Sequence, residues 1–220
     1  MSLMDFELKI SQERGFRYIG GIDEVGRGCL AGPMVTAIVV YDMENLTEIF
    51  LNSEISKKIS AIKDSKKLSE KKREELAEFI KNIANFYHIQ ENSNEEIDFQ
   101  GISNITNNSF LENFMQAQRN SQIDFVFTDA FKIKNLDSNL QESLIKGDNT
   151  SLAIASASII AKVYRDNLMK DLAKESDFQI YEFENHKGYG TGRHLELLKK
   201  LGPSKIHRKS FEPVKSMSII

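Results

Sequence analysis

Two nearly continuous apolar stretches constrain the fold of this chain most strongly. Residues 34–42 read MVTAIVVYD and residues 123–129 read IDFVFTD, and both are rich in β-branched and aromatic side chains. A strand that is apolar on both faces must be covered on both faces, as in sheets that lie between layers of helices. These stretches therefore predict a sheet flanked by helices.

Shorter patterns place the remaining elements around these two strands. Further strands are expected at 17–23 (RYIGGID), 86–90 (FYHIQ) and, more briefly, 143–148 (SLIKGD). Helical spacing of apolar residues predicts helices after a capping serine at 69, at about 110–117, 151–174 and 194–201. This order of elements predicts an α/β fold with a mixed sheet and a helical C-terminal end.

Length and composition favour one globular domain, 1–220. The chain has 220 residues, of which 40% are hydrophobic, and its single cysteine, Cys29, rules out an internal disulfide. The first ten residues carry Asp5, Glu7 and Lys9 where a signal peptide would be apolar, and no later apolar run has membrane-spanning length. We therefore expect a cytoplasmic protein with no membrane association.

The charge distribution is uneven although the net charge is only −3. Residues 57–73 and 186–215 each contain eight Lys and Arg against two acidic residues, a local net charge of +6. Such blocks can form a phosphate-binding surface on an acidic chain, because affinity for a polyanion depends on charge at the interface. Two solvated helix faces would give the same pattern, and charge alone does not separate these interpretations.

The most glycine-rich part of the chain, residues 20–33 (GGIDEVGRGCLAGP), contains two adjacent carboxylates. A phosphate loop would need Lys followed by Ser or Thr where Arg27-Gly28 stands, and Asp23 and Glu24 would repel the phosphates. A dinucleotide-binding fingerprint is excluded because a strand follows in place of a helix. The stretch therefore has another role.

Divalent metal binding is one such role. Adjacent strand residues point to opposite faces, so Asp23 and Glu24 can share a site only where the strand bends, which Gly26 and Gly28 would allow. Clustered carboxylates repel one another unless protons or cations such as Mg²⁺ or Mn²⁺ compensate them. An exposed turn with two ordinary acidic residues is the alternative.

Two further carboxylates stand at the ends of predicted strands. Asp129 ends the apolar run 123–129, and Asp148 lies just before the long helix, where capping that helix is its alternative role. The carboxyl ends of strands are the usual site position in open α/β sheets. Four carboxylates in these positions suit two-metal phosphodiester hydrolysis.

Six segments, in this order, resemble the successive motifs of ribonuclease HII, a type-two ribonuclease H. They read GIDEVGRGCLAGP, IKDSKKLSEKKREEL, FTDA, IKGDNTSLAIASASIIAKVYRD, HKGYGTGRH and LGPSKIHRKSFEPV. The resemblance extends from about Ile19 to Val214. Departures are few: Ser156 stands where the family more often has alanine, and GISNITNNS is a loose match.

The resemblance implies a fold, a reaction and a cofactor. The fold would be RNase H-like, a five-stranded mixed sheet flanked by helices, with a helical C-terminal region from about 190 that helps clamp the substrate. Asp23, Glu24, Asp129 and Asp148 would coordinate two Mg²⁺ or Mn²⁺ ions. The enzyme would cleave the RNA strand of RNA/DNA hybrids to leave a 3′-hydroxyl and a 5′-phosphate. It would also cut 5′ of single ribonucleotides in duplex DNA, and we expect a monomer.

The resemblance also implies substrate-binding residues. Gly26-Arg27-Gly28 and Tyr189 would read the ribose 2′-hydroxyl, whereas an aromatic buried at a helix start is the alternative for Tyr189. Phosphate contact or support of the site would fall to Asp64, Ser65, Lys66, Lys162 and Arg165. For Lys162 and Arg165, on the predicted long helix, an ion pair with Asp166 or Asp148 is the alternative. The C-terminal basic block is expected to clamp the DNA strand through His194, His207, Arg208 and Lys209.

Two other functions remain to be compared. Ribonuclease HIII shares the fold and the carboxylates, but that family usually carries an extra N-terminal domain and lacks the GRG loop, whereas here Asp23 lies close to the N-terminus and GRG is present. A non-catalytic nucleic-acid-binding module would need no carboxylate cluster. Both are therefore disfavoured.

Overall fold

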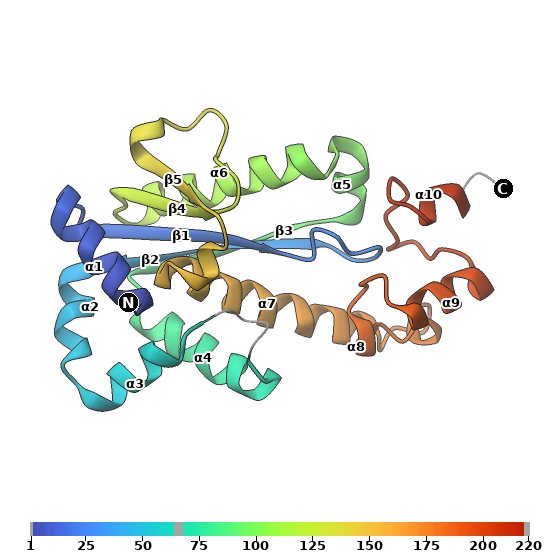
Figure 1. Cartoon of the computed structure of the whole chain (residues 1–220). Coiled ribbons are helices and arrows are strands. Elements are labelled where there is room, and N and C mark those ends of the chain that lie inside the picture. Colours follow the sequence, from blue (N-terminus) through green and yellow to red (C-terminus); the bar gives the residue numbers. More distant parts are fainter. Residues whose placement is uncertain (1, 64–67, 218–220) are drawn as a thin grey trace. The chain divides into compact units, whose positions relative to one another are not determined.

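The computed structural model describes residues 2–63 and 68–217 and divides into two compact units. The first unit comprises Met1–Glu24, Thr36–Gln90 and Asn107–Val163, and the second comprises Val25–Val35, Glu91–Thr106 and Tyr164–Ile220. The first holds nearly all of the sheet, and the second consists mainly of helices and loops (Figure 1).

The sheet has five strands in the order β3-β2-β1-β4-β5. The bounds are β1 (Tyr18–Val25), β2 (Met34–Asp42), β3 (Phe86–Asn92), β4 (Phe125–Asp129) and β5 (Gln141–Leu144). Strand β4 pairs in parallel with both β1 and β5, so the carboxyl ends of these three strands share one edge. The predicted five-stranded mixed sheet with flanking helices is confirmed.

Helices cover both faces of the sheet in the first unit (Figure 1). On one face, Phe110 and Phe114 of α6 (Ile102–Asn120) pack against Ile22 and neighbouring strand residues. On the other face, α7 (Leu152–Leu172) approaches β1 so closely that a Cβ on Gly21 would collide with its backbone. The two-sided burial of β1 and β2 follows from these contacts.

Several helices at the periphery complete the first unit and part of the second. Their bounds are α1 (Leu3–Arg14), α2 (Met43–Phe50), α3 (Ser53–Ala61), α4 (Glu70–Ile83) and α5 (Asn94–Gln100). Helix α4 begins where the sequence predicts, because the Ser69 side chain accepts a hydrogen bond from the Lys72 amide. Helices α1, α2, α3 and α5 were not expected from the sequence.

The second unit has its own small core. Phe178, Tyr181 and Phe183 pack with Met169 of α7 and with Ala31. The short helices are α8 (Phe183–His186), α9 (Gly192–Leu201) and α10 (Val214–Met217), so the predicted helical C-terminal end is confirmed. Among the described residues, no helix has the length and apolarity needed to span a bilayer.

Candidate active site

Three of the predicted carboxylates gather at one edge of the sheet in the first unit. Ile22 of β1 pairs with Thr128 of β4, so Asp23 and Asp129 occupy the next position on adjacent parallel strands. Asp148 lies in the short 3-10 helix η3 (Gly147–Asn149), shortly after β5. The charges of Asp129 and Asp148 both act on Asp23, so the three carboxylates are electrostatic neighbours.

The carboxyl group of Asp23 is buried among acidic neighbours. Its side chain is only 7% exposed. Burial, with added repulsion from Asp129 and Asp148, raises the pKa of Asp23 to about 7, although hydrogen bonds from Ser158 and the Glu24 amide oppose the shift. Near neutral pH this carboxyl group therefore binds a proton readily, and a bound cation would favour its charged form.

The turn after β5 is fixed to β4 by its backbone. The amide of Gly147 donates to Oδ1 of Asp129 at 2.7 Å. A Cβ on Gly147 would lie 2.5 Å from Cδ1 of Ile154, so the Ile154 side chain would have to shift to admit a larger residue there. The cap of α7 is Ser151, whose Oγ accepts from the Ile154 amide at 3.2 Å, and capping is therefore not the role of Asp148.

Glu24 directly follows Asp23 within β1. Strand β1 continues through Val25, so Asp23 and Glu24 are successive strand residues whose side chains start on opposite faces. Within the described ranges, no three acidic, His or Cys side chains lie close enough together to hold a metal ion. The carboxylate oxygens and the raised pKa of Asp23 nevertheless fit a hard divalent cation such as Mg²⁺ or Mn²⁺.

In the second unit, a buried arginine organises the loop that contains the GRG sequence. Arg208 is fully buried, and its guanidinium donates to the carbonyls of Gly26 (2.7 Å), Arg27 (2.8 Å) and Gly32 (2.9 Å). Burial lowers the pKa of Arg208 to about 10. Charge-assisted hydrogen bonds from a single guanidinium compensate its desolvation and fix the loop carbonyls.

A second buried arginine acts on the same loop. Arg165 of α7 donates to the carbonyls of Pro33 (2.8 Å), Lys187 (2.9 Å) and Ala31 (3.2 Å), and it is 0% exposed. The sequence leaves open phosphate contact, support of the site or an ion pair for Arg165, and these contacts with backbone carbonyls favour support.

Three of the four residues expected to form the C-terminal clamp are buried, which corrects that expectation. His194, His207 and Arg208 are each 0% exposed, so these three side chains cannot grip a DNA strand from the surface. Lys209 is exposed, as the clamp requires. The sequence suggested a surface role because basic residues are seldom fully buried.

The two glycines of the GRG sequence have different surroundings. Gly26 has φ +85°, and a Cβ there would collide with the guanidinium of Arg165. Gly28 is exposed, and a Cβ there would meet none of the described residues within 4 Å other than its own chain neighbours. The fold itself therefore requires glycine at 26, whereas at 28 it leaves open space.

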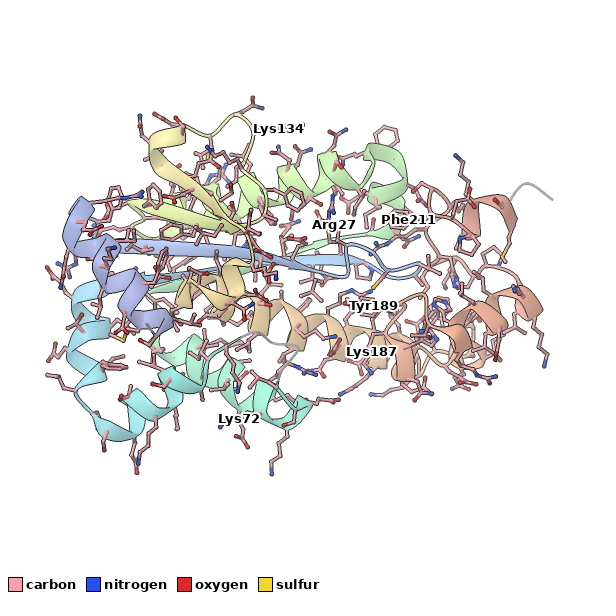
Figure 2. The ribbon with its side chains drawn as sticks, in the orientation of Figure 1. Arg27, Lys72, Lys134, Lys187, Tyr189 and Phe211 are labelled. Carbon is pink, nitrogen blue, oxygen red and sulfur yellow. The ribbon has the colours of Figure 1, made fainter. Side chains whose placement is uncertain are left out.

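Tyr189 presents a half-buried ring in the same unit. The residue is 37% exposed, and the guanidinium carbon of Arg165 lies 5.5 Å from the ring centroid. Burial, assisted by the nearby Cys29, raises the pKa of Tyr189 to about 12, so its phenol stays neutral and can donate a hydrogen bond. Arg27, Lys187 and Tyr189, labelled in Figure 2, all belong to the second unit.

Five other residues were predicted to bind the substrate or to support the site. Lys162 and Arg27 are partly buried, in the first and second unit respectively. Asp64, Ser65 and Lys66 lie outside the described residues. Cys29 is buried, and its thiol is free.

The sequence matches the ribonuclease HII family over residues 20–214. The chain belongs to this family. It is 50% identical over 196 residues to ribonuclease HII of Clostridium beijerinckii, covering 89% of this chain and 68% of that protein. Ribonuclease HII of Clostridium botulinum (strain Loch Maree) is 50% identical over 193 residues, 88% of this chain and 67% of that protein. Membership of the ribonuclease HII family identifies the chain as a ribonuclease H endonuclease.

Solved structures share the fold. Ribonuclease HII of Archaeoglobus fulgidus, solved in a complex with PCNA, aligns with TM-score 0.70 and 26% identity over 88% of this chain and 95% of that chain. Bst-RNase HIII, solved with Mn²⁺, aligns with TM-score 0.69 and 18% identity over 92% of this chain and 69% of that chain. The latter supports the fold alone.

Proposed function

We propose that this chain cleaves the RNA strand of RNA/DNA hybrids and also cuts duplex DNA on the 5′ side of a single embedded ribonucleotide. The observation that carries the proposal is the buried Asp23, which has Asp129 and Asp148 as electrostatic neighbours at the edge of the sheet. Such a group is unfavourable unless protons or cations compensate it. Phosphodiester hydrolysis with divalent metal ions uses this kind of carboxylate group.

Asp23, Glu24, Asp129 and Asp148 would hold two Mg²⁺ or Mn²⁺ ions. Bound ions would supply Lewis-acid activation of the phosphate and of the attacking water. The protein itself helps to orient these groups, because the Gly147 amide donates to Oδ1 of Asp129 and so holds that carboxylate in place.

Recognition of ribose would fall to the second unit. The open space at Gly28 lets a sugar approach the backbone, and the neutral phenol of Tyr189 can bond to a hydroxyl. A 2′-hydroxyl is the group that distinguishes RNA from DNA. This feature favours cutting at a single ribonucleotide over the hybrid-only activity that a ribonuclease HIII-like enzyme would have.

Three duplexes test the proposal: all-DNA, DNA with one ribonucleotide, and a full RNA/DNA hybrid. With Mg²⁺ or Mn²⁺ we expect cuts in the second and third only, with a 5′-phosphate on the product that begins with the ribonucleotide. Chelation of divalent ions should abolish both cuts. Cleavage of the hybrid alone would favour the HIII-like interpretation, and cleavage in excess EDTA would exclude the metal mechanism.

Asp129→Asn tests the carboxylate assignment directly. The amide oxygen can still accept from the Gly147 amide, so the turn should persist while one metal-binding charge is lost. We expect cleavage to fall about 100-fold or more, because metal-held charge stabilisation contributes several kcal/mol.

The matched control is Asp124→Asn, on the residue before β4. Its carboxylate accepts only the amides of Arg17 and Tyr18 among the contacts described, and asparagine can also accept. The control should cleave normally. A folded Asp129→Asn variant with normal rates at saturating Mg²⁺ would contradict the assignment.

A further inference from the structure

Three of the four histidines form one buried cluster in the second unit. His194 and His207 are 0% exposed and His186 is 7% exposed. The rings of His186 and His194 stack with centroids 4.1 Å apart, and Nε2 of His194 lies 3.0 Å from Nε2 of His207. The clamp predicted from the sequence does not account for this cluster, and the carboxylate chemistry does not use it.

The hydrogen bonds assign every proton in the chain of contacts. The Ser204 amide can only donate, and it lies 2.9 Å from Nδ1 of His207, so that nitrogen is an acceptor and the proton of His207 is on Nε2. Nε2 of His194 must then accept this proton, which leaves the proton of His194 on Nδ1. That Nδ1 lies 2.9 Å from the carbonyl of Tyr189 and donates to it.

Both rings stay neutral in this arrangement. Burial, joined by the charges of neighbouring histidines, lowers the pKa of His194 and of His207 to about 4. His186 is fixed in the same way, since its Nδ1 accepts from the Gly188 amide and its Nε2 donates to the carbonyl of Tyr181. The tautomers are therefore set by the backbone and remain constant near neutral pH.

The chain of bonds ends at Tyr189, whose backbone is held by several contacts. Gly188 has φ +81°, and a Cβ there would collide with the carbonyl of Ala31. The Tyr189 amide donates to the carbonyl of His186 at 2.9 Å, and its own carbonyl accepts from both Thr191 and His194. Both peptide groups of Tyr189 are thus held by residues that this cluster positions.

We propose that His207 and His194 are positioning residues: a two-imidazole hydrogen-bond chain with fixed tautomers anchors the Tyr189 carbonyl and thereby sets the orientation of the Tyr189 ring. The consequence for catalysis rests on the proposed reading of ribose by Tyr189. The hydrogen-bond chain itself stands on the contacts within the second unit.

The tautomers can be measured without any substrate. In ¹⁵N-histidine-labelled protein, long-range ¹H–¹⁵N correlations at pH 7.5 should show His207 and His186 protonated on Nε2 and His194 protonated on Nδ1. A different tautomer at His194 or His207, or a charged ring, would overturn the inference and would leave the proposed function intact.

Kinetics show whether His194 acts through Tyr189. His194→Asn can keep a donor near the position of Nδ1, whereas His194→Leu cannot. On the single-ribonucleotide duplex, we expect kcat/KM to fall about tenfold for His194→Leu, the rate equivalent of one lost buried hydrogen bond, and only about threefold or less for His194→Asn. His88→Asn is the control, because His88 bonds to Asn113 in the first unit.

The decisive comparison is a double-mutant cycle with Tyr189→Ala. If His194 acts through Tyr189, adding His194→Leu to Tyr189→Ala should change kcat/KM by less than about twofold. Multiplicative losses would show a separate structural effect and overturn the inference. If the unmodified enzyme cuts only hybrids, single-ribonucleotide recognition fails, and the same cycle on the hybrid still decides the role of His194.

Discussion

Gly26 and Gly28 are separated by one residue, yet they lack a side chain for different reasons. At Gly26 the left-handed backbone and the Arg165 guanidinium leave no room for a Cβ. At Gly28, apart from the adjoining residues, no atom of the described part of the chain lies within 4 Å of a Cβ. The structure thus separates a glycine that the fold needs from one whose smallness only a ligand could require.

Alanine at these two positions should therefore separate stability from activity. Gly26→Ala should lower the free energy of unfolding by about 1–3 kcal/mol, because alanine is strained at positive φ and displaces the guanidinium. Gly28→Ala should change the free energy of unfolding by no more than about 0.5 kcal/mol. Urea unfolding measures both values, and equal destabilisation at the two positions would contradict the distinction.

A larger side chain at Gly28 tests ligand approach. Gly28→Val should fold normally but should reduce cleavage of both the single-ribonucleotide duplex and the hybrid by about tenfold or more. The valine side chain would keep the sugar away from the backbone, which would cost at least one hydrogen bond. Normal cleavage by a folded Gly28→Val variant would show that no sugar approaches the backbone there.

At the scale of elements, α1 joins α7 through a buried acid. Glu7 is 0% exposed, and its Oε1 accepts from Ser151 Oγ (2.7 Å) and from the Ala153 amide (2.9 Å) at the start of α7. Burial raises the pKa of Glu7 to about 7, despite these hydrogen bonds. Charge on Glu7 therefore opposes folding as the pH rises.

Glu7→Gln should remove a pH dependence of stability. The folded protein binds a proton at Glu7 more tightly than the unfolded chain does. This binding therefore adds its full amount to the free energy of unfolding below about pH 4.5, and the added stability is lost as the pH rises through about 7. Relative to that of Glu7→Gln, the free energy of unfolding of the unmodified protein should fall by up to about 3 kcal/mol between pH 5 and pH 8.

Urea unfolding across this pH range, with metal chelated, measures the difference between the two proteins. Glu13→Gln, at an exposed position on the same helix, is the control and should track the unmodified protein at every pH. A difference between Glu7→Gln and the unmodified protein that stays constant with pH would show that Glu7 does not titrate in this range.

The sequence predicted the sheet better than it predicted helix α1 and the buried arginines, and the reason is physical. Apolar strands and carboxylates at their ends follow from local pattern, and Asp129 lies at the expected edge. Helix α1 was missed because Glu7 occupies the centre of its buried face, between Met4 and Ile10, and breaks the apolar stripe. The buried roles of Arg165 and Arg208 depend on carbonyls distant in sequence, which no local pattern reveals.

At the scale of the whole molecule, the basic block 186–215 offers fewer cations for binding phosphates than its composition suggests. Arg208 is buried, and Arg193 pairs with Glu182 and Glu196. Lys205 forms an exposed pair with Asp177 at 3.5 Å, and such pairs contribute little and break easily. Lys205 and Lys209 are both exposed, so they are candidates for phosphate contact within this block, whereas the buried Arg208 is not.

Replacing Lys205 and Lys209 together by glutamine should weaken binding to all three duplexes and reduce the log-log salt slope by roughly 0.9 for each phosphate that the protein no longer neutralises. Replacing Lys132 and Lys134, exposed residues of the loop after β4 (Figure 2 labels Lys134), changes the net charge equally and provides the control. Binding is measured by anisotropy of labelled duplexes in EDTA at several salt concentrations. If both pairs alter the slope equally, net charge alone governs binding; if only the first pair does, the C-terminal block contacts the nucleic-acid backbone.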